Sequence, residues 1–582
     1  MADYEIKNIY QGGYSSLKPE YGNFVGYRMG AGNFGMSTDA RTANILKDVS
    51  KNLSAGAKHV ELTQVSPEVF ESVPKQQLKE LNRLSKLTGV EISVHAPVLE
   101  PSGFNREGRF SEEDRKNVER QMFQAVERSH EINPTGNIPV TFHSSAGLPG
   151  EISQKGEAIN ETFVIDSEKG SMHKFPIKER NFPGEGEKSI GKELEEINKE
   201  QWSEKIRTIN YYADLGGERL HYLETAAALA EKKAGKHTDE EERIISSSRH
   251  GAAYLNDSYR QLKDLFELAN KYGSHEDKEK LIKFRKEIEP IAIEIKKDPK
   301  NYFHNAPLMK KIIDKGVETF NEFKSYPEIF KPLNEFSKEK TVETFSNIAL
   351  ESYKKFKDKS PIISIENPPA GGAFSTGTEL KELVEKSREK FVEKAVEKGF
   401  GKSEAEDAAK KLIGATWDVG HINMLRKFGY ESKDIIAHSE QIAPLVKHVH
   451  LSDNFGFEHT ELPMGMGNVP VKEIMQKLEK EGFKGKKVIE ALSWWQHFSE
   501  QGATPPLQPT LEAFGSPMSS VGGMPYWNQS VGFQQGYFGG YGQMLPQMNY
   551  ETFGAGFSTL PSELGGQRPS AGGSRMSGRP ME

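Results

Sequence analysis

Short apolar segments alternate with longer amphipathic helical patterns along two stretches of this 582-residue chain, at about 23–150 and 337–495. Such alternation predicts a parallel sheet, because each helix carries the chain back to the start of the next strand. The two stretches together supply eight strand candidates, the number that closes a TIM barrel. These candidates are 24–29, 59–63, 90–96, 138–144, 362–367, 413–418, 446–453 and 487–492. The predicted fold class is therefore α/β, a TIM (β/α)8 barrel.

Two other stretches depart from this alternation. Residues 151–336, between the fourth and fifth predicted strands, are rich in Lys and Glu and carry several helical patterns after a hairpin-like segment, so we expect a helical insertion there. From about residue 500 the chain turns to Gly, Pro, Ser, Met, Gln and aromatics, a composition that buries too little apolar surface to offset its ordering entropy. The predicted regions are 1–150, first half of the barrel; 151–336, helical insertion; 337–499, second half of the barrel; and 500–582, a low-complexity disordered tail.

Both added regions have two interpretations. The insertion is either an elaborated loop that packs on the barrel or a lid over the substrate, because the loops of such barrels often shape the site. The tail is either solvated or, through its interleaved Tyr, Phe and Gly, binds an unknown partner.

The composition excludes several kinds of site and partner. The chain has 0 cysteines, which excludes a disulfide framework, a thiolate zinc site and a cysteine nucleophile. No apolar run approaches the ~20 residues that cross a bilayer, and the first residues lack a signal-peptide pattern. We therefore expect a cytoplasmic protein with no membrane partner. The net charge of -7 gives no general basic surface for nucleic acid, although a local groove can still be positive.

A side chain able to bind metal stands near the C-terminal end of six predicted strands. Because side chains alternate along a strand, His95 shares a face with Ser93, and the apolar Ile92 and Val94 point the other way. If the apolar side chains face the helices, the six converge at the mouth of the barrel, where TIM-barrel active sites lie. The six are His95, His143, Glu366, Asp418, His450 and Glu490.

Three imidazoles and three carboxylates without a thiolate suit zinc, manganese or iron. A carboxylate such as Glu366 can bridge two such ions. His421, three residues after Asp418, can approach the same centre, and His459 and Glu461 can point the same way from an extended loop. Glu61 also lies on a strand, either as a structural charge or as a functional group.

The motifs SVHAP, FHSSAG, IENPPAGGAFSTG, DVGH, HLSDN and VIEAL follow one another in this order. In this combination the chain resembles the xylose isomerase-like TIM-barrel superfamily, and more closely its endonuclease IV branch, AP endonuclease family 2. The resemblance implies cleavage of DNA on the 5′ side of an abasic site, with abasic double-stranded DNA as partner and two or three Zn²⁺ ions. It assigns His95, His143 and Glu366 to a first ion, Glu366, Asp418, His450 and Glu490 to a second, and His421, His459 and Glu461 to a third. Glu366 and Glu490 are the expected catalytic carboxylates.

The seventh loop departs from the endonuclease IV pattern. His459-Thr460-Glu461 stands where that family has Asp-x-His, and Gly465-Met466-Gly467 stands where it has Gly-Glu-Gly. The first change alters the third ion site, and the second leaves the DNA-contacting loop without its usual residues.

Two alternatives to a nuclease therefore stay open. One is a sugar or sugar-phosphate isomerase or epimerase of the same superfamily, with one Mn²⁺ or Mg²⁺ ion and with Glu366 and Glu490 moving protons. The acidic charge and the altered loop favour it. The other is a non-catalytic scaffold, which the retention of six potential ligands disfavours. His95 and His143, which complete a multi-ion site, make the nuclease the leading prediction.

Overall fold

The structure, a computed structural model, describes residues 25–40, 44–54, 56–64, 66–177, 190–230, 238–298, 301–491, 506–515, 568–570, 573–576 and 579–580. Eight parallel strands close into a barrel in the order β1-β11-β10-β9-β8-β4-β3-β2, which confirms the predicted α/β barrel. The strands are β1 (Phe34–Ser37), β2 (His59–Thr63), β3 (Glu91–His95), β4 (Pro139–His143), β8 (Ile362–Glu366), β9 (Ile413–Asp418), β10 (Val446–Leu451) and β11 (Lys487–Ile489).

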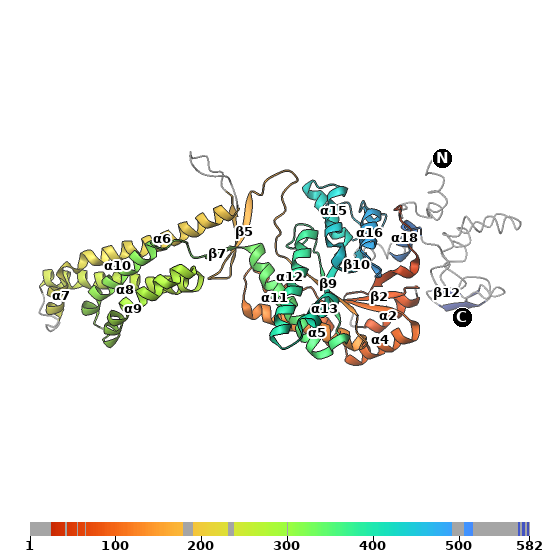
Figure 1. The fold of residues 1–582 in the computed structure, drawn as a ribbon, viewed down its shortest axis with the longest axis horizontal. Coiled ribbons are helices and arrows are strands. Elements are labelled where there is room, and N and C mark those ends of the chain that lie inside the picture. Colours follow the sequence, from red (N-terminus) through yellow and green to blue (C-terminus); the bar gives the residue numbers. More distant parts are fainter. Residues whose placement is uncertain are drawn as a thin grey trace. The chain divides into compact units, whose positions relative to one another are not determined.

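Helices lie around these strands (Figure 1). They begin and end at local signals in the sequence: Ser111 caps α5 through its side chain, and Gly89 ends α4 in the left-handed conformation with φ 71°. The α-helices are α2 (Ile45–Ser54), α3 (Pro67–Ser72), α4 (Lys75–Thr88), α5 (Glu112–Ile132), α11 (Leu333–Phe356), α12 (Gly377–Glu397), α13 (Lys402–Leu412), α14 (Val419–Asn423), α15 (Ser432–Ile442) and α16 (Val471–Lys480).

The first strand lies later in the chain than predicted. Residues 24–29 are not a strand where the structure describes them, and β1 instead follows the 3-10 helix η2 (Ala31–Asn33). The segment FGMS has weak strand character in sequence because it contains Gly35. That glycine is needed in the barrel, since a Cβ at this position would stand 2.6 Å from Cδ2 of His59 on the neighbouring strand.

Residues Asn160–Phe336 form a compact unit of their own. It contains the expected hairpin, β5 (Glu161–Asp166) with β6 (Met172–Pro176), and β7 (Phe330–Pro332) pairs antiparallel to β5 on the other side. Its helices are α6 (Ile190–Glu218), α7 (Leu223–Ala230), α8 (Asp239–Tyr272), α9 (His275–Lys297) and α10 (Tyr302–Asn321). Long helices run side by side (Figure 1), with α8 packed against α6 and α10. Trp202 stacks on Phe323 and meets Phe320 edge-on in the core of this unit.

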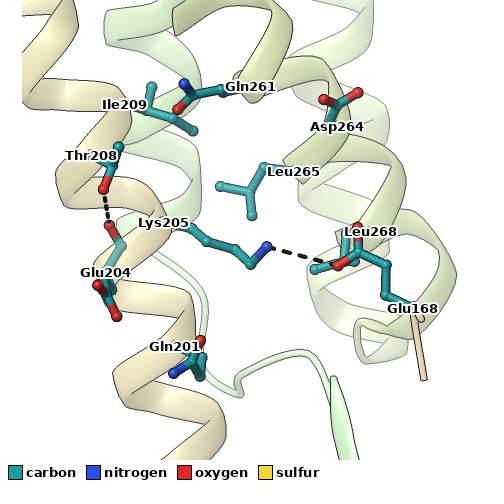
Figure 2. A pocket seen from close by; sticks show the side chains of 10 residues that line it. All are labelled: Glu168, Gln201, Glu204, Lys205, Thr208, Ile209, Gln261, Asp264, Leu265 and Leu268. Atoms are coloured by element: carbon teal, nitrogen blue, oxygen red, sulfur yellow. Dashed lines mark hydrogen bonds and ion pairs between the residues drawn. The ribbon is translucent and has the colours of Figure 1, made fainter. Parts of the chain in front are cut away.

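A cleft of about 430 Å³ opens between α6 and α8 of this unit (Figure 2). Lys205 reaches into it and lies 3.8 Å from the carboxylate of Glu168, beside the apolar Leu265 and Leu268. Such a mixture of apolar and charged side chains is typical of the groove between two amphipathic helices. The candidate metal groups found among the described residues lie on the barrel strands and at their ends.

Part of the predicted disordered tail, 500–582, is ordered. The helix α18 (Leu507–Ala513) leads to Phe514, whose ring lies 5.0 Å from that of Phe34 at the start of β1. The N–H of Val25 donates to the carbonyl of Ala513 at 2.8 Å. The sequence pattern does not predict this helix, because its few apolar residues lie within a low-complexity region.

Near the end of the chain the short strands β12 (Arg568–Ser570), β13 (Gly573–Met576) and β14 (Arg579–Pro580) pair with one another. The rest of the tail prediction lies outside the described residues. Among the helices that the structure describes, none is long and apolar enough to cross a membrane.

Candidate metal centre

The barrel brings together the six side chains that the sequence places at strand ends. His95, His143, Glu366 and Asp418 are the last residues of their strands, His450 is next to last in β10, and Glu490 directly follows β11. Strand register fixes their heights, since His143 is the register partner of Glu366, and His450 that of Asp418. All six therefore meet at the C-terminal mouth of the barrel.

Four of these residues form a central group. Glu366, Asp418, His450 and Glu490 each offer one ligand atom, and the four atoms all lie within 4.8 Å of one another. Nδ1 of His450 lies 2.7 Å from Oε1 of Glu366 and 2.9 Å from Oε2 of Glu490. The first three residues are fully buried, whereas the Glu490 side chain is 19% exposed.

Three carboxylates this close oppose one another's ionisation. Burial raises the pKa of Asp418 well above its usual range, and the charges of Glu490 and Glu366 raise it further. Burial acts in the same direction on Glu366, but the imidazoles of His450 and His143 outweigh it and lower the pKa of Glu366 well below its usual range. A divalent cation between the carboxylates would remove the repulsion that falls on Asp418.

The donor set fits such a cation. Among the described residues, the buried Oε2 of Glu490 and Nε2 of His450 have no hydrogen-bond partner, although each has a charged atom nearby. A buried polar atom without a partner costs about 1–3 kcal/mol, and a cation at the centre of the group would bind the Glu490 oxygen. Three carboxylates with one imidazole suit Mn²⁺, Mg²⁺ or Zn²⁺.

Two further histidines flank Glu366. Nε2 of His95 lies 3.1 Å and Nε2 of His143 lies 3.4 Å from Oε2 of Glu366. Nδ1 of His95 lies 3.0 Å from the carbonyl oxygen of Ala96, which holds the ring with Nε2 toward Glu366. Burial would lower the pKa of His95, but Glu366 outweighs burial and raises it to about 9. Burial lowers the pKa of His143.

His421 and His459 form a pair at the rim of the mouth, which we call the rim pair. Their Nε2 atoms lie 2.8 Å apart, and Nε2 of His459 lies 3.7 Å from Oε1 of Glu461. Burial, followed by the neighbouring His459, lowers the pKa of His421 to about 3. Asp418 accepts a hydrogen bond from the His421 N–H at 2.7 Å, so this ligand candidate also caps α14 and sets the position of His421.

Asp453 holds the loop that carries His459. Its carboxylate accepts hydrogen bonds from the N–H groups of Gly465 at 2.8 Å and Val469 at 3.1 Å. Gly467 passes so close that a Cβ there would stand 2.4 Å from Oδ1 of Asp453. The changed sequence of this loop therefore still encodes a defined turn.

A group that sequence reasoning does not assemble lies inside the barrel. Glu61 of β2 meets His448 and His450 of β10, and ligand atoms of the three lie within 4.8 Å of one another. Alternation along each strand puts His448 on the same face as His450. It does not show that Glu61 reaches them, because β2 and β10 are not neighbours in the sheet.

Comparison with known proteins supports the nature of the barrel. Residues 379–504 match the family described as xylose isomerase-like TIM barrel. That range holds Asp418, His421, His450, the two loop candidates and Glu490. The match thus covers most of the second half of the barrel and about a fifth of the chain.

Individual relatives match more loosely. A stretch of 84 residues, 14% of this chain, is 31% identical to an uncharacterised protein of Methanocaldococcus jannaschii, and the chain spans 27% of the length of that protein. A solved D-tagatose 3-epimerase-like protein has 15% identity and a TM-score of 0.33, over 82% of this chain and 98% of that one. A D-psicose 3-epimerase from Clostridium cellulolyticum H10 has 9% identity and a TM-score of 0.38, over 83% and 96%.

Proposed function

We propose that this xylose isomerase-like barrel belongs to a divalent-metal-dependent enzyme that isomerises or epimerises a sugar or sugar phosphate. The observation that carries the proposal is the central group of Glu366, Asp418, His450 and Glu490. Among the candidate metal groups of the described residues it unites the most ligands, and it alone contains two glutamates. One ion and two carboxylates are enough to move a proton between neighbouring carbons of a sugar.

The two glutamates have the properties that this chemistry requires. His450 outweighs burial and lowers the pKa of Glu490 to about 2, so that its carboxylate is ionised at neutral pH, the state in which it can bind a cation. Its partial exposure lets it reach a substrate at the mouth. Glu366, fully buried and facing the same Nδ1 of His450, is the second carboxylate able to hold the proton. A divalent cation bound here would polarise the substrate carbonyl.

His95 and His143 complete the environment of a small polar substrate. The side chain of His143 is 17% exposed, and its Nε2 lies on the Glu366 side of the mouth. From there it is placed to hydrogen-bond a sugar hydroxyl. The net charge of -7 gives no general attraction to nucleic acid, and the Gly-Met-Gly loop carries no charged side chain. Both observations favour a sugar over DNA as the substrate.

A second candidate function is hydrolysis of abasic DNA. It is favoured by the rim pair and by the two histidines that flank Glu366, because a single-ion isomerase needs neither as ligands. Two imidazole nitrogens lie 2.8 Å apart in this pair, and imidazole is a ligand type that an additional Zn²⁺ ion would bind. Zn²⁺ at several positions would stabilise the charge that develops on a phosphate.

One experiment separates the two functions. Purified full-length protein, loaded with Mn²⁺ or with Zn²⁺, is incubated with a panel of keto sugars and sugar phosphates and, separately, with a duplex that carries one abasic-site analogue. We expect interconversion of at least one sugar, lost in Glu490→Gln and retained in Glu91→Gln, whose carboxylate is exposed at the opposite end of β3. Cleavage 5′ of the lesion without sugar conversion would replace the first function by the second. Neither reaction, from a folded and metal-loaded protein, would refute both.

A further inference from the structure

We propose that Glu61 is a positioning residue for the metal centre: its carboxylate lies behind His450 and selects the ring orientation and tautomer in which Nδ1 serves as ligand. The inference rests on the proposed metal centre, and it holds for either of the two candidate activities.

The two ring nitrogens of His450 face different carboxylates. Nδ1 faces Glu366 and Glu490, and Nε2 lies 2.9 Å from Oε1 of Glu61. A neutral imidazole carries one N–H, and the nitrogen that binds a metal must be the bare one. A carboxylate can only accept a hydrogen bond, as Glu61 does from Nε2. Without a cation, Glu366 and Glu490 can accept a proton from Nδ1 in the same way. A cation bound between them would take the place of that proton, and Glu61 would then favour the tautomer that keeps its proton on Nε2 and leaves Nδ1 bare. Histidines that bind metals commonly donate their other N–H to a carboxylate in this way.

Glu61 is itself held in place. Its side chain is 2% exposed, and Oε2 accepts a hydrogen bond from the hydroxyl of Ser93 at 2.7 Å. Nε2 of His448 lies 2.8 Å from the same oxygen. Nε2 of His450 lies 2.9 Å from the other oxygen, Oε1. The contacts of Ser93 and His448 at Oε2 offset part of the cost of keeping a charge away from water.

The polar contacts continue away from the mouth. Nε2 of His59 lies 2.8 Å from the hydroxyl of Ser93, and Gly35 leaves the space that the His59 ring occupies. Interior positions of such barrels are mostly filled by branched apolar side chains. A polar group of this extent is costly when it serves stability alone, because apolar replacements of buried ion pairs are often neutral or stabilising. A role in holding His450 accounts for its presence.

The three side chains Glu61, His448 and His450 are also close enough to hold an ion of their own. The hydroxyl of Ser93 already occupies Oε2 of Glu61, and hydrogen bonding satisfies the carboxylate without a cation. We therefore assign hydrogen bonding to this group, and the test below includes the ion as a contrary outcome.

The test measures metal binding as well as activity. Chelator-treated full-length protein is titrated with Zn²⁺ in competition with a chromogenic chelator, for the wild type, Glu61→Gln and the control Glu91→Gln. We expect Glu61→Gln to bind the same number of ions with about 10–100-fold lower affinity, the range found when such partners of ligands are removed. The imidazole ¹⁵N shifts of the Zn²⁺-loaded protein, assigned with His450→Asn, should report a changed tautomer balance for His450. A purely structural role of Glu61 would not move that signal in a folded variant.

Ser93→Ala keeps the test decisive if Glu61→Gln does not fold. It removes one donor to Glu61 without touching His450, and we expect a smaller loss of Zn²⁺ affinity in the same direction. The proposal would be overturned if folded Glu61→Gln bound Zn²⁺ with wild-type affinity. If Glu61→Gln does not fold, wild-type Zn²⁺ affinity in Ser93→Ala would overturn it. So would an additional ion in the wild type that is lost in both Glu61→Gln and His448→Asn. Wild-type protein that binds Zn²⁺ tightly but turns over no substrate would refute the proposed function alone, whereas failure to bind any divalent ion would refute both.

Discussion

The group around Glu366 and the rim pair contain similar side chains but are built differently. Residues of the first group sit on strand ends, where register sets their heights, as it does for His143 opposite Glu366. His421 instead lies on the one-turn helix α14, and His459 lies on a loop organised by Asp453. The barrel strands therefore fix the central group. The rim pair instead depends on a short helix and on a loop that keeps a defined turn although its sequence departs from the endonuclease IV pattern.

The charges of the two regions differ as well. Glu366 faces imidazoles on several sides, and His95 beside it has a pKa of about 9. In the rim pair an imidazole faces another imidazole, and the pKa of His421 is about 3. A cation entering the first region must displace protons from charged imidazoles, whereas a cation at the rim pair meets His421 as a neutral imidazole at pH 7.

The largest expected effect comes from Glu366→Ala. This change removes the carboxylate that faces His95, His143 and His450, so we expect at least a 100-fold loss of metal affinity and loss of all turnover. Metal analysis after gel filtration and the assays above would measure it, with Glu91→Gln as the matched control. Wild-type metal content in Glu366→Ala would show that the central group is not the metal centre.

The pH dependence of metal binding should separate the two regions. A raised pKa means that His95 is protonated at pH 7 and loses its proton near pH 9, and His450, whose pKa is also raised, adds to the effect. His450 must lose a proton to bind a cation, and a cation beside Glu366 opposes the protonation of His95. Metal affinity should therefore rise with pH between about 7 and 9, by about tenfold per unit for each proton displaced. Titrations at three pH values would show this, and His95→Asn should reduce the slope by one proton. A slope unchanged by His95→Asn would show that the bound ion does not displace the His95 proton.

A smaller effect is expected from His459→Ala. If the rim pair holds its own ion, this variant loses one ion per chain, while sugar conversion at the central group stays within about tenfold of the wild type. The measurement is metal stoichiometry together with sugar turnover. A loss of sugar turnover as severe as that of Glu366→Ala would show that the two regions act as one centre, which favours the multi-ion nuclease.

The smallest effect is expected from Gly467→Ala. The added Cβ would stand 2.4 Å from the carbonyl oxygen of Asn454, so the loop must shift, and we expect about 1–3 kcal/mol lower stability. Gly32→Ala is the control, because nothing lies within 4 Å of a Cβ there. Thermal unfolding would measure the difference between the two variants. An equal melting temperature would show that the loop yields without cost.

Local sequence patterns predict most of the barrel and the six strand-end positions of the site. Strands β2 and β9 have the predicted bounds, because alternation and strand length are encoded locally. The first strand is missed because Gly35 is explained only by its contact with His59 across the sheet. Glu61 is left undecided because its meeting with His450 depends on closure of the barrel. The proximity of His421 to His459 depends on a folded loop rather than on a period in the sequence.

The inserted unit enters and leaves through neighbouring strands, since β5 pairs with β7 from Val164 opposite Pro332 to Asp166 opposite Phe330. The barrel strands on either side of it, β4 and β8, pair directly with each other. Removal of the whole unit would therefore leave the register between β4 and β8 as it is. The same arrangement makes this junction a natural point for genetic excision, or for exchange with another module of similar end-to-end spacing.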